Sequence, residues 1–277
     1  MEKGADMCAR PLLQVQNLSV AFEMYDTNEL YFKAQKQLVF VLQDLNFSIS
    51  AGEVVAIIGE SGAGKTTLID SILGLNPENA HVTGEILVCD APRDKHVHSN
   101  KRSSDRLHGA MCKTATPRTN DMVFIPQTVS HLDPMRRMGK LPGAGLFEQY
   151  GLSPDVKNMY PHQLSGGMAK RVLFCNALAL NPRIILADEP TSGLDEQLAL
   201  EILGDIRNFA TDKDGGVLIV THDISLTLNV ADRIAVFKDG TIAEIAIAGN
   251  FRDPHLLQHP YSRALVQALP ENEFCGN

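Results

Sequence analysis

The feature that most constrains this chain is an apolar run that leads directly into a glycine-rich loop. Residues 54–58 read Val-Val-Ala-Ile-Ile, and the next eight have the pattern Gly-x-x-x-x-Gly-Lys-Thr. A continuous apolar run is typical of a strand buried on both faces of a parallel sheet. Glycines let backbone N–H groups approach phosphate oxygens, and the helix expected over residues 66–75 points its free amides at the same anion. The pattern predicts an α/β fold that binds a nucleoside triphosphate.

Each part of this loop has an expected task at the phosphates. Lys65 supplies a point charge for the β- and γ-phosphates, and Thr66 supplies a hydroxyl for Mg²⁺. The alternative is a plain glycine turn between a strand and a helix. The buried strand expected before the loop counts against this alternative. The residues expected to bind nucleotide here are Gly59, Glu60, Ser61, Gly62, Ala63, Gly64, Lys65, Thr66 and Thr67.

A second apolar strand ends in two adjacent carboxylates. Residues 184–187 read Ile-Ile-Leu-Ala, and Asp188 and Glu189 follow. Buried charges must be compensated, and a metal ion together with a water molecule would compensate both. We expect Asp188 to hold Mg²⁺ and Glu189 to act as the general base toward an attacking water, an effect of about 10²- to 10⁴-fold for such groups. A surface pair at a strand end is the alternative.

Apolar patterns elsewhere predict the rest of the fold. Alternation predicts antiparallel strands at residues 13–22 and 41–50, with a polar loop over 23–37. Buried strands at 183–187 and 217–220, separated by a helix over 198–209, indicate strand-helix-strand units and a parallel sheet.

The composition limits the class of protein. The chain has 277 residues, 44% of them hydrophobic, which is ample for a core. Its formal net charge of -8 argues against nucleic acid as a partner. Apolar runs of about 18 residues are absent, the N-terminal residues lack a signal-peptide layout, and the 5 cysteines form no C-x-x-C pair. We expect a cytoplasmic chain with reduced thiols.

Residues 90–120 have little apolar periodicity and are interpreted as an exposed insertion. A metal site is an alternative, because the segment contains His96, His98, His108 and Cys112. The absence of tight ligand spacing counts against it.

Three further short motifs follow in a fixed order. Gln127 comes after an apolar stretch, residues 164–168 read Leu-Ser-Gly-Gly-Met, and His222 comes just after the expected strand at 217–220. With the glycine loop and the paired carboxylates, this order makes the chain resemble the ATP-binding subunit of an ABC transporter over residues 13–269.

The resemblance implies a fold and a domain organisation. The expected fold class is an α/β P-loop ABC ATPase with a mainly parallel core sheet, an antiparallel β edge subdomain and a short helical subdomain. Residues 1–277 would form a single domain. Its RecA-like core and antiparallel edge would comprise 11–126 and 181–250, a shortened helical subdomain 127–180, and a C-terminal tail 251–277. The stretch from Gln127 to Ser165 is shorter than the usual helical subdomain of the family, and residues 141–145, Leu-Pro-Gly-Ala-Gly, cannot continue a helix well.

The resemblance also implies roles for individual residues. Two subunits would pair head to tail, so that Ser165, Gly166 and Gly167 of one contact the γ-phosphate bound to the other. Gln127 would contact Mg²⁺ and the γ-phosphate, His222 the γ-phosphate, and Asp195 would couple the two sites. Phe22 is expected to stack on adenine. The aromatic residues that compete with it for this position are Tyr25, Tyr31 and Phe32.

Residues 259–265, His-Pro-Tyr-Ser-Arg-Ala-Leu, resemble the C-terminal pattern of ATPases from peptide, nickel and metallophore (opine) importers. They are also expected to form a short amphipathic helix that docks on the body of the fold. Cys275 alone cannot supply the four thiolates of an iron–sulfur cluster.

We therefore expect a peripheral ATPase on the cytoplasmic face of the inner membrane. It would energise uptake of nickel or a metal chelate first, and of peptides second. Its partners would be a second ABC ATPase subunit, two transmembrane permease subunits and, indirectly, an extracytoplasmic solute-binding protein. A soluble ABC ATPase of DNA repair or translation is the alternative, against which the lack of heptads and of duplication counts. An inactive subunit is a third, disfavoured because no required side chain is missing.

Overall fold

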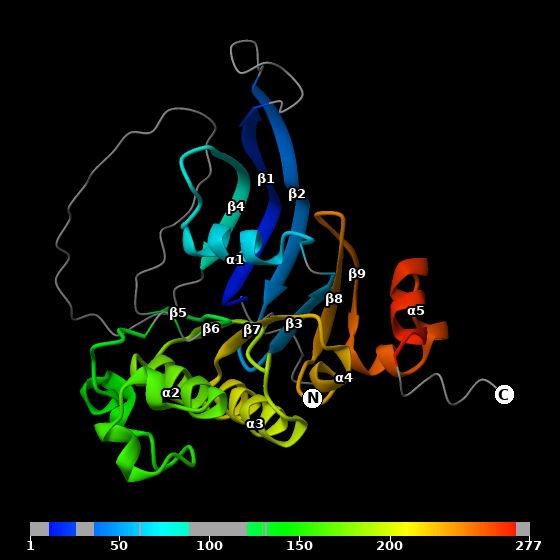
Figure 1. Cartoon of the computed structure of the whole chain (residues 1–277). Helices are drawn as coiled ribbons and strands as arrows, with labels where there is room; N and C mark the ends of the chain where they lie inside the picture. The colour runs from blue at the N-terminus through cyan, green and yellow to red at the C-terminus, as the bar shows by residue number, and fades with distance from the viewer. Residues whose placement is uncertain are drawn as a thin grey trace, which may run out of the picture.

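The structure is a computed structural model that describes residues 11–25, 36–60, 62–88, 121–128, 130 and 132–269. Ser61, Tyr31, Phe32, Cys275 and the predicted insertion at 90–120, with its histidines and Cys112, lie outside these residues. The described chain forms two sheets with helices on either side (Figure 1).

The larger sheet has six strands in the order β5-β6-β7-β3-β8-β9. All neighbours are parallel except β8 and β9. Every residue of β3, β6 and β7 is buried, as the continuous apolar runs predict. The strands are β3 (Val54–Gly59), β5 (Met122–Ile125), β6 (Ile184–Asp188), β7 (Gly216–Thr221), β8 (Arg233–Lys238) and β9 (Thr241–Ile247).

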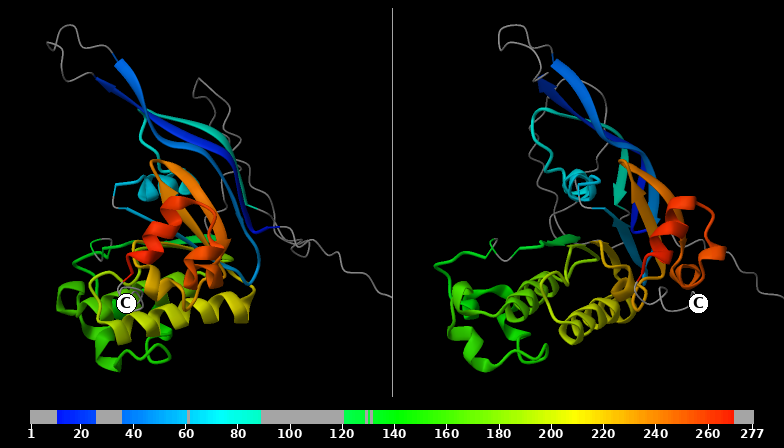
Figure 2. Two further views of the ribbon diagram at one scale, coloured as in Figure 1. Left: turned by 90° about the vertical axis from the view of Figure 1, so that its right-hand side faces the viewer. Right: turned by 45° about the vertical axis from the view of Figure 1, so that its right-hand side comes forward.

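The smaller sheet is antiparallel, in the order β2-β1-β4, with β1 at Leu13–Tyr25, β2 at Lys36–Ile49 and β4 at Ala80–Val88. It confirms the predicted antiparallel edge. The predicted polar loop over 23–37 is too wide, because Met24 pairs with Gln37 and Tyr25 with Lys36. Backbone hydrogen bonds extend both strands beyond their apolar alternation, and the strand ends project away from the rest of the fold (Figure 2).

The helices are α1 (Lys65–Leu73), α2 (Gly166–Ala179), α3 (Glu196–Lys213), α4 (Ile224–Thr227) and α5 (Pro260–Gln267). Helix α1 ends earlier than predicted, because Gly74 takes a left-handed conformation that closes it. Helix α3 begins earlier, because Asp195 caps it. Helix α5 is the predicted amphipathic helix: Tyr261, Leu265 and Leu269 pack on the core, and the helix lies beside β9 (Figure 1).

Between Pro126 and Ser165 the described residues form turns and short 3-10 helices instead of α-helices. Pro142, Pro154 and Pro161 each stand in the first turn of one of them, where a missing N–H costs nothing. The 3-10 helices here are Met138–Lys140, Pro142–Gly145, Pro154–Asn158 and Pro161–Gln163, and two more follow β9 at Ala248–Arg252 and Pro254–Leu256.

Two apolar cores lie on opposite faces of the larger sheet. One face packs on α2 and α3, whereas the other packs on α1 and the antiparallel sheet. Alternate residues of β3 serve the two cores: Ala56 and Ile58 belong to the first, Val55 and Ile57 to the second. In the described part of the chain, no helix is both long and apolar enough to span a membrane.

Candidate nucleotide-binding site

The carboxyl ends of β3, β6 and β7 meet at one edge of the larger sheet and enclose a cleft of about 480 Å³. Such an edge is where ligands bind in open α/β sheets. Nearly all of the cleft's lining residues were predicted from sequence to act on nucleotide. The lining residues are Val41, Gly62, Gly64, Lys65, Thr66, Thr67, Gln127, Asp188, Glu189 and His222.

The glycine loop turns sharply between β3 and α1. Gly62 and Gly64 have φ values of 83° and 99°, a region that favours glycine. At Gly64 a Cβ atom would also lie 3.1 Å from the carbonyl oxygen of Val41. The loop therefore brings backbone N–H groups and the N-terminus of α1 to the cleft without obstruction by side chains.

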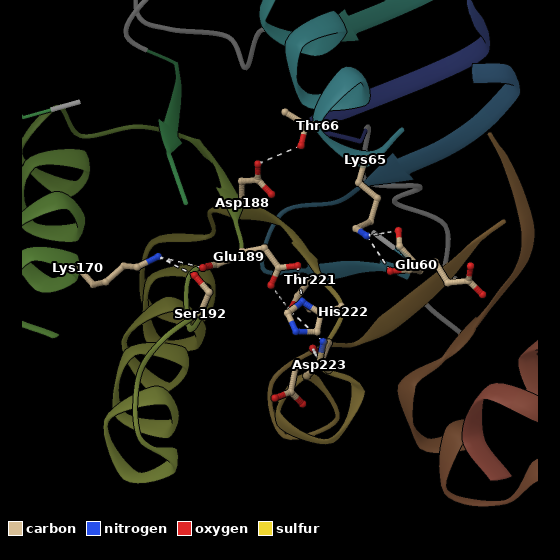
Figure 3. Close-up of polar contacts among 12 residues, drawn as sticks. Glu60, Lys65, Thr66, Lys170, Asp188, Glu189, Ser192, Thr221, His222 and Asp223 are labelled. Atoms are coloured by element: carbon tan, nitrogen blue, oxygen red, sulfur yellow. Dashed lines mark hydrogen bonds and ion pairs between the residues drawn. The ribbon is translucent and has the colours of Figure 1, made fainter. Parts of the chain in front are cut away.

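Lys65 begins α1 and folds back over the loop (Figure 3). Its Nζ donates hydrogen bonds to the carbonyl oxygens of Gly59 and Glu60, each at 2.7 Å. Burial lowers the pKa of Lys65, while the carboxylates of Glu189 and Asp188 act in the opposite direction. The cleft thus holds one buried ammonium group facing two carboxylates.

Asp188 lies at the end of β6, opposite the start of α1. Thr66 Oγ1 donates to Asp188 Oδ2 at 3.4 Å. Burial, followed by the neighbouring Glu189 carboxylate, raises the pKa of Asp188. A hydroxyl beside a carboxylate suits Mg²⁺, which usually takes only one or two carboxylates and completes its shell with phosphate and water oxygens. The described residues contain no cluster of three or more acidic, His or Cys ligands.

Glu189 is held by contacts at both carboxylate oxygens and along its backbone. Thr221 Oγ1 donates to its Oε2 at 3.0 Å, and His222 Nδ1 lies 2.7 Å from its Oε1. Its N–H donates to the carbonyl oxygen of Val220 at 2.8 Å. The backbone has φ 46°, a left-handed conformation that is uncommon outside glycine. Such strain is characteristic of functional sites, where the surroundings fix it.

Sequence reasoning missed Lys170 and Thr221 at this site. Lys170 Nζ donates to the carbonyl oxygens of Gln127 and Glu189, and Thr221 donates to Glu189. The position of Thr221 between a buried strand and His222 could have indicated it. A lysine in the helical stretch after residues 164–168 gave no such indication, because lysines on helices usually face solvent.

The glycine-serine motif lies outside the cleft of its own chain. Ser165 caps α2 by accepting from the N–H of Met168 at 3.3 Å, and both Ser165 and Gly166 are exposed. Gly167 packs against Leu198 of α3. Asp195, also exposed, accepts from the N–H of Leu198 at 3.0 Å. Within one chain, these residues cap and pack helices.

Phe22 is partly buried and pairs with Val39 and Ala80, but it is not among the lining residues of the cleft. Tyr25, the competing aromatic residue that the structure describes, lies at the projecting strand end and is exposed. Glu60 contacts the C-terminal helix instead of the cleft, because its carboxylate accepts from the Tyr261 hydroxyl at 3.1 Å. Ala63, between Gly62 and Gly64, packs on the core that contains α1.

Comparisons with known proteins agree with this geometry. The ABC transporter family profile matches residues 42–192, more than half of the chain. The oligopeptide transport ATP-binding protein OppD of Lactococcus lactis subsp. cremoris (strain SK11) is 32% identical over 285 residues, which cover 95% of this chain and 77% of OppD. The glutathione import ATP-binding protein GsiA of Shigella dysenteriae serotype 1 (strain Sd197) is 29% identical over 290 residues, covering 98% of this chain and 44% of GsiA.

Among solved structures, the dimeric post-hydrolysis state of the ATP-binding cassette MJ0796, bound to ADP and Pi, is similar to this fold with a TM-score of 0.63. It is 25% identical in sequence, and the match covers 85% of this chain and 98% of that chain. The chain belongs to the ABC transporter family and is one of its ATP-binding cassettes, an ABC-type ATPase.

Proposed function

We propose that this chain is the ATP-hydrolysing subunit of a bacterial importer and that its cargo is peptides. One observation carries the ATPase assignment: three separate segments of the chain bring Lys65, Asp188, Glu189 and His222 to a single cleft. The glycine loop would bind the β- and γ-phosphates through its N–H groups, with Lys65 adding positive charge.

The two carboxylates take different tasks in this proposal. Thr66 and Asp188, with the exposed side chain of Gln127 nearby, would hold Mg²⁺, which neutralises phosphate charge when bound. Glu189 would orient the attacking water and accept its proton. The hydrogen bonds from Thr221 and His222 support this task, because they hold the carboxylate that must receive the proton.

A complete catalytic site in this proposal needs two ATPase subunits. Ser165 and Gly166 are exposed at the start of α2 and stay outside the cleft of their own chain, which leaves them available to the nucleotide of a partner. The dimeric form of MJ0796 described with ADP and Pi supports such a pairing. The partner would be a second copy of this chain or a related ATPase subunit. Asp195, which is also exposed, would couple the two sites.

The names of the relatives, which specify oligopeptide transport and glutathione import, support a role in import. We infer that the chain sits on the cytoplasmic face, bound to two permease subunits, and serves a solute-binding protein indirectly. Peptides become the first cargo because OppD and GsiA are named for oligopeptide transport and glutathione import. Nickel or a metallophore, predicted first from residues 259–265, becomes the second. A soluble ATPase of DNA repair or translation is disfavoured by the same relatives.

Hydrolysis is tested by measuring phosphate release from ATP by the purified chain and by Lys65→Ala. Loss of the ammonium should abolish nucleotide-dependent activity, because no other cation of the described loop reaches the cleft. Lys140→Ala, an exposed lysine in a 3-10 helix, is the control. A wild-type rate equal to that of Lys65→Ala would identify an inactive or regulatory subunit.

The importer assignment is tested by recovering the tagged chain from gently solubilised membranes with and without ATP. Two permeases and a related ATPase among the co-eluting chains would support it, and peptide or metal in the recovered solute-binding subunit would decide the cargo. Recovery of soluble chains alone would favour the DNA-repair or translation class instead.

A further inference from the structure

Lys170 is buried in α2 and contacts three segments around the cleft. Figure 3 shows its contacts with Glu189 and Ser192. Only 6% of the residue is exposed. Its Nζ donates to the carbonyl oxygen of Gln127 at 2.7 Å, to that of Glu189 at 3.0 Å, and to Ser192 Oγ at 3.5 Å. The ammonium group therefore uses its full set of donors, although a lysine is rarely fully buried without such partners.

The three acceptors belong to different parts of the fold. Gln127 follows β5, Glu189 follows β6, and Ser192 stands in the turn before α3. Lys170 itself lies on the helix that Ser165 begins. The Lys170 side chain thus connects α2, the helix that begins at the glycine-serine motif, to two other parts of the site. These are Gln127, proposed to contact Mg²⁺, and Glu189, the proposed general base.

The backbone at Glu189 depends on such a contact. Its φ of 46° is uncommon for a residue with a side chain, so the conformation requires support from the surroundings. Val220 accepts from the N–H of Glu189, and Lys170 donates to the carbonyl of the same residue. The N–H of Ser192 also donates to this carbonyl, at 3.1 Å. Removing the ammonium would leave the carbonyl with that single neutral donor, so the peptide is held more weakly and the carboxylate on the same Cα can shift.

Charge fits the same arrangement. Burial lowers the pKa of Lys170, and the carboxylates of Glu189 and Asp188 oppose that effect. A hydrogen bond from an ammonium group to a carbonyl is stronger than one between neutral groups. A neutral donor at this position would therefore hold the same carbonyls more weakly.

We propose that Lys170 is a positioning residue, an inference that rests on the proposed ATP hydrolysis. It fixes the position of Glu189 and links Glu189 to α2, the helix that begins after Ser165. Lys170 does not touch substrate in this assignment. It acts through the backbone of Glu189, so its loss lowers turnover while nucleotide binding through the glycine loop is retained.

The test compares ATP hydrolysis by wild type, Lys170→Met and Lys170→Gln. Lys170→Met should lower kcat by about 10²-fold, the scale expected for a small misplacement of a catalytic group, with KM for ATP unchanged. Lys170→Gln should fall between it and wild type, because an amide still donates hydrogen bonds. Lys157→Met, which removes a partly exposed lysine paired with Glu148, should retain full activity.

A double-mutant cycle separates positioning from general destabilisation. If Lys170 acts through Glu189, adding Lys170→Met to Glu189→Gln should slow turnover no further. Additive losses, a wild-type kcat in Lys170→Met, or a rise in KM equal to the fall in kcat would each overturn the assignment.

Folding and the parent proposal are checked separately. Should Lys170→Met fail to fold, Lys170→Gln decides: reduced kcat with a native Tm supports the role, and wild-type kcat contradicts it. An inactive wild type would refute the hydrolytic function itself, whereas an active wild type matched by Lys170→Gln would refute only the role of Lys170.

Discussion

The two sheets differ in how firmly their surroundings hold the side chains at their edges. In the larger sheet, β3, β6 and β7 are buried throughout and end together at the cleft, so Lys65, Asp188 and His222 follow from rigid elements. In the smaller sheet, the far ends of β1 and β2 expose Tyr25, Leu38 and neighbouring apolar residues. The proposed phosphate chemistry thus lies at the edge formed by these buried strands, here called the rigid edge. The proposed stacking of Phe22 on adenine lies at the exposed ends of the smaller sheet, here called the open edge. A small shift of β1 there would move the aromatic ring.

The largest effect is expected at the rigid edge. Glu189→Gln keeps the shape of the side chain and the contacts to Thr221 and His222 but cannot accept a proton. Turnover should fall by about 10²- to 10⁴-fold, whereas ATP binding should persist and an ATP-bound dimer accumulate. Phosphate release and light scattering measure the two effects.

Glu85→Gln, in β4 of the smaller sheet, is the matched control and should turn over like wild type. A Glu189→Gln variant with normal turnover would assign the base elsewhere, and one that stays monomeric at saturating ATP would contradict the paired arrangement.

The next effect concerns stability and compares the sheets directly. Ile57 in β3 is 0% exposed, so Ile57→Ala should lower the free energy of unfolding by about 2–5 kcal/mol. Leu38 in β2 is 52% exposed, so Leu38→Ala should change it by no more than about 0.5 kcal/mol. Urea unfolding measures both. A comparable loss at Leu38 would mean that the projecting strands are packed against another surface in solution.

A smaller effect is expected at the open edge. If Phe22 stacks on adenine, Phe22→Ala should raise KM for ATP by about 3- to 10-fold and leave kcat unchanged. Met24→Ala, farther along the same strand, should bind ATP like wild type. An increase in KM with Tyr25→Ala, and none with Phe22→Ala, would transfer the stacking role to Tyr25.

The smallest effect concerns the contact between the C-terminal helix α5 and the glycine loop. Tyr261→Phe removes the hydrogen bond to Glu60 and keeps the ring that packs on the core. Stability should fall by about 0.5–1.5 kcal/mol at most. Hydrogen exchange in α5 is the readout, and protection equal to wild type would show that packing alone holds this helix.

The rigid edge could be predicted from sequence because its strands are continuous apolar runs that stop at polar residues. Residues 54–58 lead to the glycine loop and residues 184–187 lead to Asp188. Both the phosphate-binding loop and the carboxylates opposite it could therefore be predicted. The contacts of Lys170 were not, because it binds backbone carbonyls, and a carbonyl carries no residue identity. Its burial depends on how α2 packs against loops distant in sequence.

The open edge was predicted less well for a related reason. Alternation of apolar residues located the centres of β1 and β2 but not their ends, because the pairing of Tyr25 with Lys36 needs only backbone groups. The position of the base-stacking ring depends on the shape of those ends, so Phe22 stays a prediction.

The strand order of the larger sheet has a consequence for how the chain is made. Val54 pairs with Val217, and Val55 pairs with Arg233, so both neighbours of β3 lie far downstream in the sequence. A nascent chain on the ribosome that has not reached β7 therefore exposes an apolar strand with two unpaired edges, a template for aggregation. Translation that pauses before Gly216 should make this protein depend on a chaperone until the missing strands emerge.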